Sequence, residues 1–291
     1  MRVSDASRHE TLQFQLERTG IAVDRAMESL TTGRRINRLS DDPDRAVVAD
    51  RVGAEVSALE TYQRAADNAR SWLATQDTAL QGAVSLVQRA RELAIAAGSS
   101  QSPEAAAGIA IEIESIRSQL IDAANSRFDG RAVFAGFAEA AVASDGTLLA
   151  DGGDVMRRVS DTLVMSISAS AADAFGFTAG DDLFTVLEDL ATAVRSGDTA
   201  AVGGAGLQRL LDRQRDLTDA LGAVGARTNN VEHAVTTSTT RRDDLLAYRS
   251  SIVDIDFAEA AVELTAAETA YQAVLAATAR LQRTNLLDYL G

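Results

Sequence analysis

The 291-residue chain carries 42 Asp and Glu against 28 basic residues, all of them arginine, for a net charge of −14 at pH 7. It contains neither lysine nor cysteine, which excludes Schiff-base lysines, P-loop lysines, thiol catalysis, disulfides and cysteine-ligated metals. The excess of negative charge disfavours nucleic acid as a partner. The sequence has no run of about 18 apolar residues and no apolar core near its N-terminus, so we expect neither membrane insertion nor a cleaved signal peptide.

The N-terminal segment predicts an amphipathic helix that begins near His9 and ends near Gly33. Apolar and small residues recur there every three or four positions, which keeps them on one helical face. Gly33 can adopt the left-handed conformation that closes a helix. The stripe consists of Leu12, Leu16, Thr19, Val23, Ala26 and Leu30.

The two prolines of the chain mark the starts of two further helices. Asp42 precedes Pro43 and Ser102 precedes Pro103, so each proline follows a side chain that can cap the first turn. From Pro43 the helical periodicity continues without a break to Ala97, a length of roughly 80 Å at 1.5 Å per residue. Such a helix is longer than a compact domain needs.

The segment 131–180 has a different pattern, with glycine-bearing turns between short runs of alternating apolar residues. The clearest run is 163–168, in which Leu163, Met165 and Ile167 would share one face of a strand. We therefore expect a small β-rich element in the middle of the chain.

Helical periodicity returns after Asp182 and continues almost to the C-terminus. A seven-residue repeat places Leu210, Leu217, Val224, Val231, Ser238, Leu245 and Ile252 on one coiled-coil seam. A last helix is expected after Asp254 or Asp256. Its two heptad series are Phe257, Leu264, Tyr271 and Thr278, and Ala260, Ala267, Val274 and Leu281.

These patterns predict a mainly α fold, in which both termini form a long antiparallel helical coiled-coil rod with a small β-rich domain inserted in the middle. Three parts follow from this arrangement. Residues 1–40 and 253–291 would form a terminal coiled-coil domain, residues 41–130 and 181–252 a helical rod, and residues 131–180 the outer β-rich domain.

The sequence offers no catalytic, cofactor-binding or metal-binding site, so we expect a protein that is not an enzyme. Its two histidines, His9 and His233, have no ligand pattern near them, and a site needs converging groups. The acidic pairs before predicted helices are better explained as helix caps than as cation ligands.

Two stretches resemble signatures of the bacterial flagellin family. The first is Leu30–Asn37 with Ser40–Pro43, and the second comprises Val224–Asn229 and Ile252–Ala260. Within the family, the start at Met1–Ser4, the stretch Gly130–Gly136 and the ending Asn285–Gly291 look more like the hook-associated protein 3 group than like flagellin itself. The matching signature residues are Gly33, Arg35, Ile36, Asn37, Asp41, Asp42, Pro43 and Asn229.

The resemblance implies a structural subunit of the bacterial flagellum without catalysis or cofactors, acting as an adaptor between the hook-associated region and the flagellin filament. Its implied partners are further copies of itself in a ring or helical assembly, a hook-associated protein 1 type subunit, flagellin, and a flagellar export chaperone. The chain would leave the cell through the flagellar type III apparatus and reside in the extracellular flagellum. The alternatives are flagellin itself and, more remotely, an unrelated helical rod.

For a subunit of this kind, the apolar stripes of the terminal helices would form the assembly interface. The polar residues Arg35, Asn37, Asp41 and Asp42 would fix the connection between the first helix and the rod. The predicted interface residues are Leu12, Leu16, Val23, Leu30, Phe257, Leu264, Tyr271, Val274 and Leu281.

Overall fold

The computed structural model describes residues 2–98 and 102–290, and the side chains of residue 7 and of residues 10–98 and 102–280. The chain forms two compact units. The terminal unit comprises residues 1–57 and 242–291, and the central unit comprises residues 58–241. The finer three-part division expected from the sequence remains a prediction.

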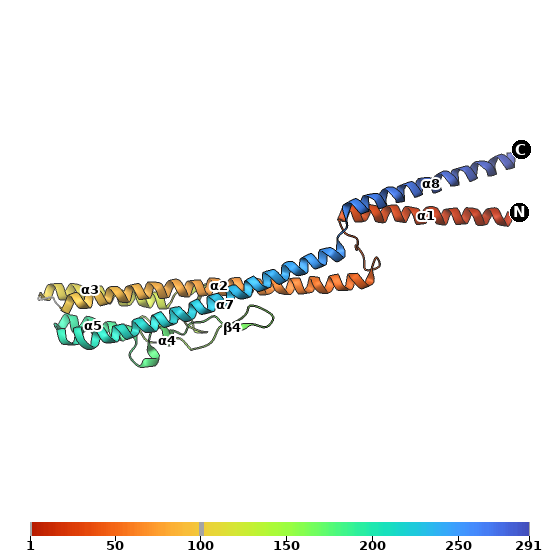
Figure 1. The fold of residues 1–291 in the computed structure, drawn as a ribbon. Helices are drawn as coiled ribbons and strands as arrows, with labels where there is room; N and C mark the ends of the chain where they lie inside the picture. The colour runs from red at the N-terminus through yellow and green to blue at the C-terminus, as the bar shows by residue number, and fades with distance from the viewer. Residues whose placement is uncertain (1, 99–101, 291) are drawn as a thin grey trace. The chain divides into compact units, whose positions relative to one another are not determined.

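The fold is mainly α, as the helical periodicity predicts (Figure 1). The strands form two separate two-stranded antiparallel sheets, β1 (Arg127–Phe128) with β2 (Arg131–Ala132) and β3 (Met156–Arg158) with β4 (Val164–Ser166). The α-helices are α1 (Arg2–Thr32), α2 (Pro43–Gly98), α3 (Pro103–Ala124), α4 (Ala171–Ala174), α5 (Leu183–Ser196), α6 (Thr199–Ala201), α7 (Leu207–Val253) and α8 (Phe257–Leu290). A 3-10 turn, η1 (Phe177–Ala179), follows α4, and a π-helical turn, η2 (Val202–Gly206), precedes α7.

Side-chain caps fix the helix starts at the predicted positions. The Asp42 carboxylate accepts a hydrogen bond from the Arg45 N–H at 3.1 Å, directly before α2. Ser102 caps α3, and Asp182 accepts from two amides of the first turn of α5. Because these caps satisfy amides that have no partner within the helix, the local sequence determines where these three helices begin. Helix α1, by contrast, begins at Arg2 and not near His9 as predicted.

In the central unit, α2 and α7 lie side by side and bury the predicted heptad seam. Leu210, Leu217, Val224 and Val231 are fully buried in a single core together with Trp72, Leu73, Leu80 and Val87 of α2. An ion pair between Arg70 and Glu232, 3.4 Å long, joins the two helices at the surface. The heptad prediction is confirmed for this part of α7.

The segment 131–180 contains less strand than its alternating pattern predicts. Strand β4 covers only Val164–Ser166 of the predicted run, although Ile167 is fully buried as expected. Most of the segment is irregular. Packing between aromatic side chains, rather than pairing between strands, holds it against the rest of the unit. The ring of Phe175 lies 5.7 Å from that of Phe134 and 5.6 Å from that of Phe184 of α5.

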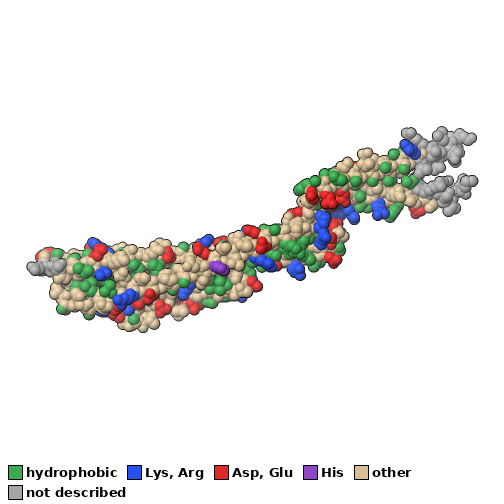
Figure 2. Space-filling view, viewed as in Figure 1, with side chains coloured by type: hydrophobic (Ala, Val, Ile, Leu, Met, Phe, Trp, Pro, Cys, Tyr) green, Lys and Arg blue, Asp and Glu red, His purple; other side chains and the backbone are tan. Residues whose placement is uncertain are grey.

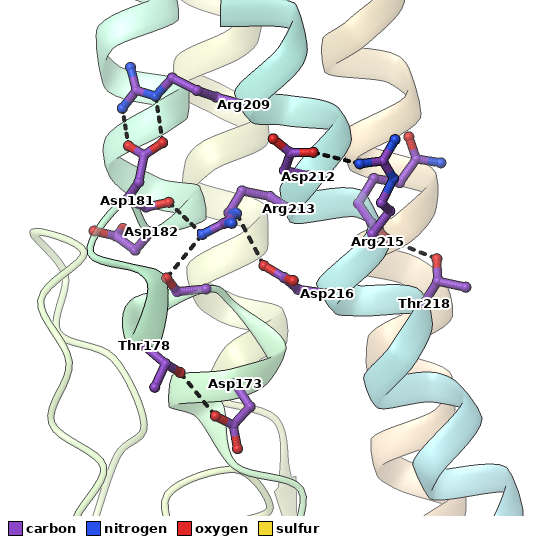
Figure 3. A network of polar contacts seen from close by, with 12 residues as sticks. Asp173, Thr178, Asp181, Asp182, Arg209, Asp212, Arg213, Arg215, Asp216 and Thr218 are labelled. Atoms are coloured by element: carbon purple, nitrogen blue, oxygen red, sulfur yellow. Dashed lines mark hydrogen bonds and ion pairs between the residues drawn. The ribbon is translucent and has the colours of Figure 1, made fainter.

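Two arginines of α7 hold the segment that leads into α5 (Figure 3). Arg209 forms a bidentate ion pair with Asp181, whose pKa is lowered chiefly by the hydrogen bonds from that guanidinium, and a second pair with Asp189 at 2.9 Å. Arg213 is only 8% exposed and donates to the carbonyls of Gly176 at 3.1 Å and Asp181 at 2.9 Å. The central unit therefore depends on a buried charge that satisfies backbone carbonyls.

Candidate assembly site

Helices α1 and α8 lie side by side and antiparallel in the terminal unit (Figure 1). Their shared seam is thin, because the residues of these two helices that are buried in the described part of the chain are both alanines, Ala26 and Ala260. A helix pair that buries so little apolar surface gains little stability by itself.

The predicted interface residues occupy this seam and its edges. Phe257 is 62% exposed, and Leu281 lies outside the residues whose side chains are described. The half-buried members are Leu12, Leu16, Val23, Leu30, Leu264, Tyr271 and Val274.

Exposed apolar side chains also lie outside the seam on both helices, at positions that the heptad patterns did not predict. On α1, Phe14, Ile21 and Met27 are exposed, and Phe14 and Ile21 border an open groove beside α8. On α8, Val262 is 71% exposed. Small side chains beside Val262 line a shallow apolar groove along α8, made of Ala261, Thr265, Ala266, Thr269, Ala270 and Ala273. Phe14 and Ile21 are seven residues apart and therefore share one side of α1, a spacing in the sequence that could have indicated these exposed residues.

Exposed apolar side chains are concentrated in the terminal unit. Among the described residues, ten of the seventeen large hydrophobic side chains that lie exposed belong to it, although it is the smaller unit. Figure 2 shows hydrophobic side chains on the surface of the α1–α8 pair. Single exposed apolar residues are ordinary in proteins, so this concentration in one unit makes the unit the candidate for an interaction surface.

We call the segments 33–42, between α1 and α2, and 254–256, between α7 and α8, the connectors. They meet in a short antiparallel bridge between Arg34 and Asp254. The Arg35 N–H donates to the Val253 carbonyl at 2.7 Å, and the Arg35 guanidinium Nη2 donates to the Ile252 carbonyl at 2.8 Å. These carbonyls belong to the last turn of α7, where no helical amide can reach them. Arg35 therefore caps α7 from a position 217 residues away.

The bonding is reciprocal, because the segment before α8 also holds the residue that follows α1. The Ile255 N–H donates to the Gly33 carbonyl at 3.1 Å. Gly33 has a φ of +69°, a left-handed conformation that glycine adopts without strain and that closes the helix as predicted. We call these three hydrogen bonds, the two between backbone groups that form the Arg34–Asp254 bridge and the one from the Arg35 guanidinium, the connector bridge.

Other signature residues order the chain between α1 and α2. The Asp41 carboxylate accepts from the backbone N–H groups of Asn37 at 3.1 Å and Arg38 at 2.8 Å. The Asn37 side chain donates to the Arg34 carbonyl at 3.0 Å, and Ile36 is half-buried. Asp42 and Pro43 then begin α2. The structure thus brings these residues together within one connector.

Asn229 is the exception among the signature residues. It lies exposed in the middle of α7, in the central unit, and the helix continues through it without interruption. It therefore makes no part of the connector bridge.

An open groove of about 840 Å³ lies between α1, α8 and the connectors. Arg18 and Arg25 of α1 line it together with Glu259 and Glu263 of α8. Because charges of both signs alternate on its wall, the groove does not select a strongly charged ligand. Within the described ranges, no three His, Asp or Glu side chains converge as metal ligands, and no helix is long and apolar enough to span a membrane.

Comparison with known proteins gives two family matches. The bacterial flagellin N-terminal helical region matches residues 5–139, and the bacterial flagellin C-terminal helical region matches residues 209–290. The flagellin of Bacillus subtilis is 24% identical over 289 residues, which covers 95% of both chains. The flagellar hook-associated protein 3 of Salmonella typhimurium is 31% identical over 156 residues, 51% of this chain and 48% of that protein.

A solved structure shares the fold. The crystal structure of Bacillus cereus FlgL superposes with a TM-score of 0.62 at 20% identity, covering 69% of this chain and 99% of that chain. The two helical regions together cover most of the chain, including nearly all of α1 and the whole of α8. The chain therefore belongs to the bacterial flagellin family.

Proposed function

We propose that this chain is the flagellar subunit that joins the hook-associated region to the flagellin filament. The carrying observation is the terminal unit, whose two helices share a thin seam and leave uncovered both apolar side chains of α1 and an apolar groove of α8. Burial of these apolar surfaces against neighbouring subunits supplies the free energy that the isolated pair lacks. The half-buried seam residues, with Leu281, complete the interface.

The junction role is supported by likeness to the hook-associated proteins. The structure of Bacillus cereus FlgL shares this fold over 99% of its own chain and 69% of this one. The hook-associated protein 3 of Salmonella typhimurium is similar in sequence over 51% of this chain. In this role the chain contacts copies of itself, a hook-associated protein 1 type subunit and flagellin. An export chaperone and type III export without a cleaved signal belong to the same proposal.

Flagellin itself is the second candidate, because the flagellin of Bacillus subtilis aligns with almost the entire chain. The two roles differ in copy number and position along the flagellum. A junction subunit forms a short band, whereas flagellin forms the whole filament.

Deleting the gene separates these candidates. For a junction subunit, the mutant cells keep hooks but lose filaments. Flagellin is then released into the medium, because the subunit to which it binds at the end of the hook is missing. Electron microscopy of the cells and immunoblotting of the medium measure both effects, with the full-length gene restored as the control. Loss of filaments without released flagellin would instead identify the chain as flagellin, and normal filaments would contradict both roles.

A further inference from the structure

The seam between α1 and α8 does not determine by itself how far one helix is shifted along the other. Its buried residues are alanines, whose side chains are too small to act as knobs that fit one set of holes. The larger seam residues repeat every seven positions on both helices, as Leu16, Val23 and Leu30 do on α1. A shift of α8 by one heptad, about 10 Å, therefore places seam residues opposite one another again, with Leu264 or Thr278 in place of Tyr271.

The structure nevertheless has one register. Gly20 of α1 lies opposite Tyr271 of α8, since a Cβ on Gly20 would lie 3.7 Å from the Tyr271 ring. At the connector end, a Cβ on Gly33 would lie 3.6 Å from the Phe257 ring. Both pairs fit a single antiparallel alignment of the two helices.

We propose that the connector bridge sets this register, with Arg35 as its positioning residue. The bridge lies where α1 ends and α8 begins, and it holds Gly33 against Ile255 and Arg35 against Val253. A heptad shift would separate these backbone groups, so the bridge favours the observed alignment of α1 and α8 over a shifted one. The Arg35 guanidinium is the one side-chain donor of the bridge, so a substitution at Arg35 can weaken the bridge without changing its backbone hydrogen bonds.

This inference rests on the proposed function in one respect: the register decides which residues α8 presents to neighbouring subunits. In the observed register, Val262 and the small residues beside it lie on the outer face. If α8 were shifted along α1, the residues that it presents to a neighbouring subunit would be displaced by the same distance.

The absence of cysteine makes the register measurable in the full-length chain. The pair Gly20→Cys with Tyr271→Cys reports the observed register. Gly20→Cys with Leu264→Cys and Gly20→Cys with Thr278→Cys report shifts by one heptad in the two directions. Each pair is oxidised in dilute solution, and the yield of intramolecular disulfide is read by gel electrophoresis and mass spectrometry.

With Arg35 present, the 20/271 pair should close far more than either shifted pair. Arg35→Ala should raise the ratio of shifted to observed disulfide about five-fold, as expected for one charge-assisted hydrogen bond at an exposed site. Arg35→Lys keeps a charged donor and should give an intermediate ratio. Arg34→Ala is the matched control, because it removes the same charge from the neighbouring residue and leaves the guanidinium bond to Ile252 intact.

The inference is overturned if Arg35→Ala and Arg34→Ala give the same ratio, or if the three pairs close equally with Arg35 present. Assembly is assayed separately on the same variants without added cysteines. A shifted register with normal assembly would support the register inference and contradict the proposed interface, so the two can fail independently.

Discussion

Replacing Val262 by glutamate is expected to abolish self-association of the chain while leaving its fold intact. Val262 is 71% exposed on α8, so a carboxylate there remains in water in the isolated subunit. On assembly the same carboxylate would be buried without a partner, at a cost of about 3–5 kcal/mol per interface. Such a cost lowers an association constant by a factor of about 10² or more.

The control is Gln272→Glu, which adds the same charge at an exposed polar position of the same helix. Sedimentation of the purified variants at increasing concentration measures association, and circular dichroism melting measures the fold. Gln272→Glu should assemble close to the unmodified chain. If Val262→Glu also assembles normally, the outer face of α8 is not the interface.

Replacing Arg213 by methionine is expected to destabilise the central unit by about 3 kcal/mol. The aliphatic stem is kept, but the carbonyls of Gly176 and Asp181 lose a buried charged donor, and Asp216 loses a partner 3.1 Å away. For a unit of this size the thermal midpoint should fall by about 6–12 °C.

Arg215→Met is the matched control, because Arg215 is 69% exposed and pairs with Asp212 of its own helix, at 2.7 Å (Figure 3). An exposed pair of this kind contributes a few tenths of a kcal/mol. Differential scanning calorimetry of both variants makes the comparison. Equal melting temperatures would show that the Arg213 network does not hold the segment before α5.

The helices were predictable because their signals are local. The caps at Asp42, Ser102 and Asp182 and the heptad residues of α7 each act on neighbouring positions, so the sequence alone carries the information. The fully buried Leu210 and Leu217 are where the repeat places them.

The connector bridge could not be predicted from the pattern of residues. Its bonds join groups about 220 positions apart, and most of them are made by backbone atoms that any residue carries. Arg35 was singled out only through the family resemblance. The assembly role of the residues around it remains a proposal.

Arg213 was missed for a different reason. An arginine in a heptad helix is expected to face solvent, and Arg213 is buried because Gly176, at a φ of +81°, leaves room for its side chain. A Cβ at residue 176 would collide with the guanidinium stem. That complementarity exists only after the chain has folded.

Immunogold labelling of intact flagella with antibody against this chain tests the proposed position most directly. We expect a short band of label between the hook and the filament, because a junction subunit occupies only that zone. Label along the whole filament would contradict the junction role and identify the chain as flagellin, and absence of label from every flagellum would contradict a flagellar role altogether.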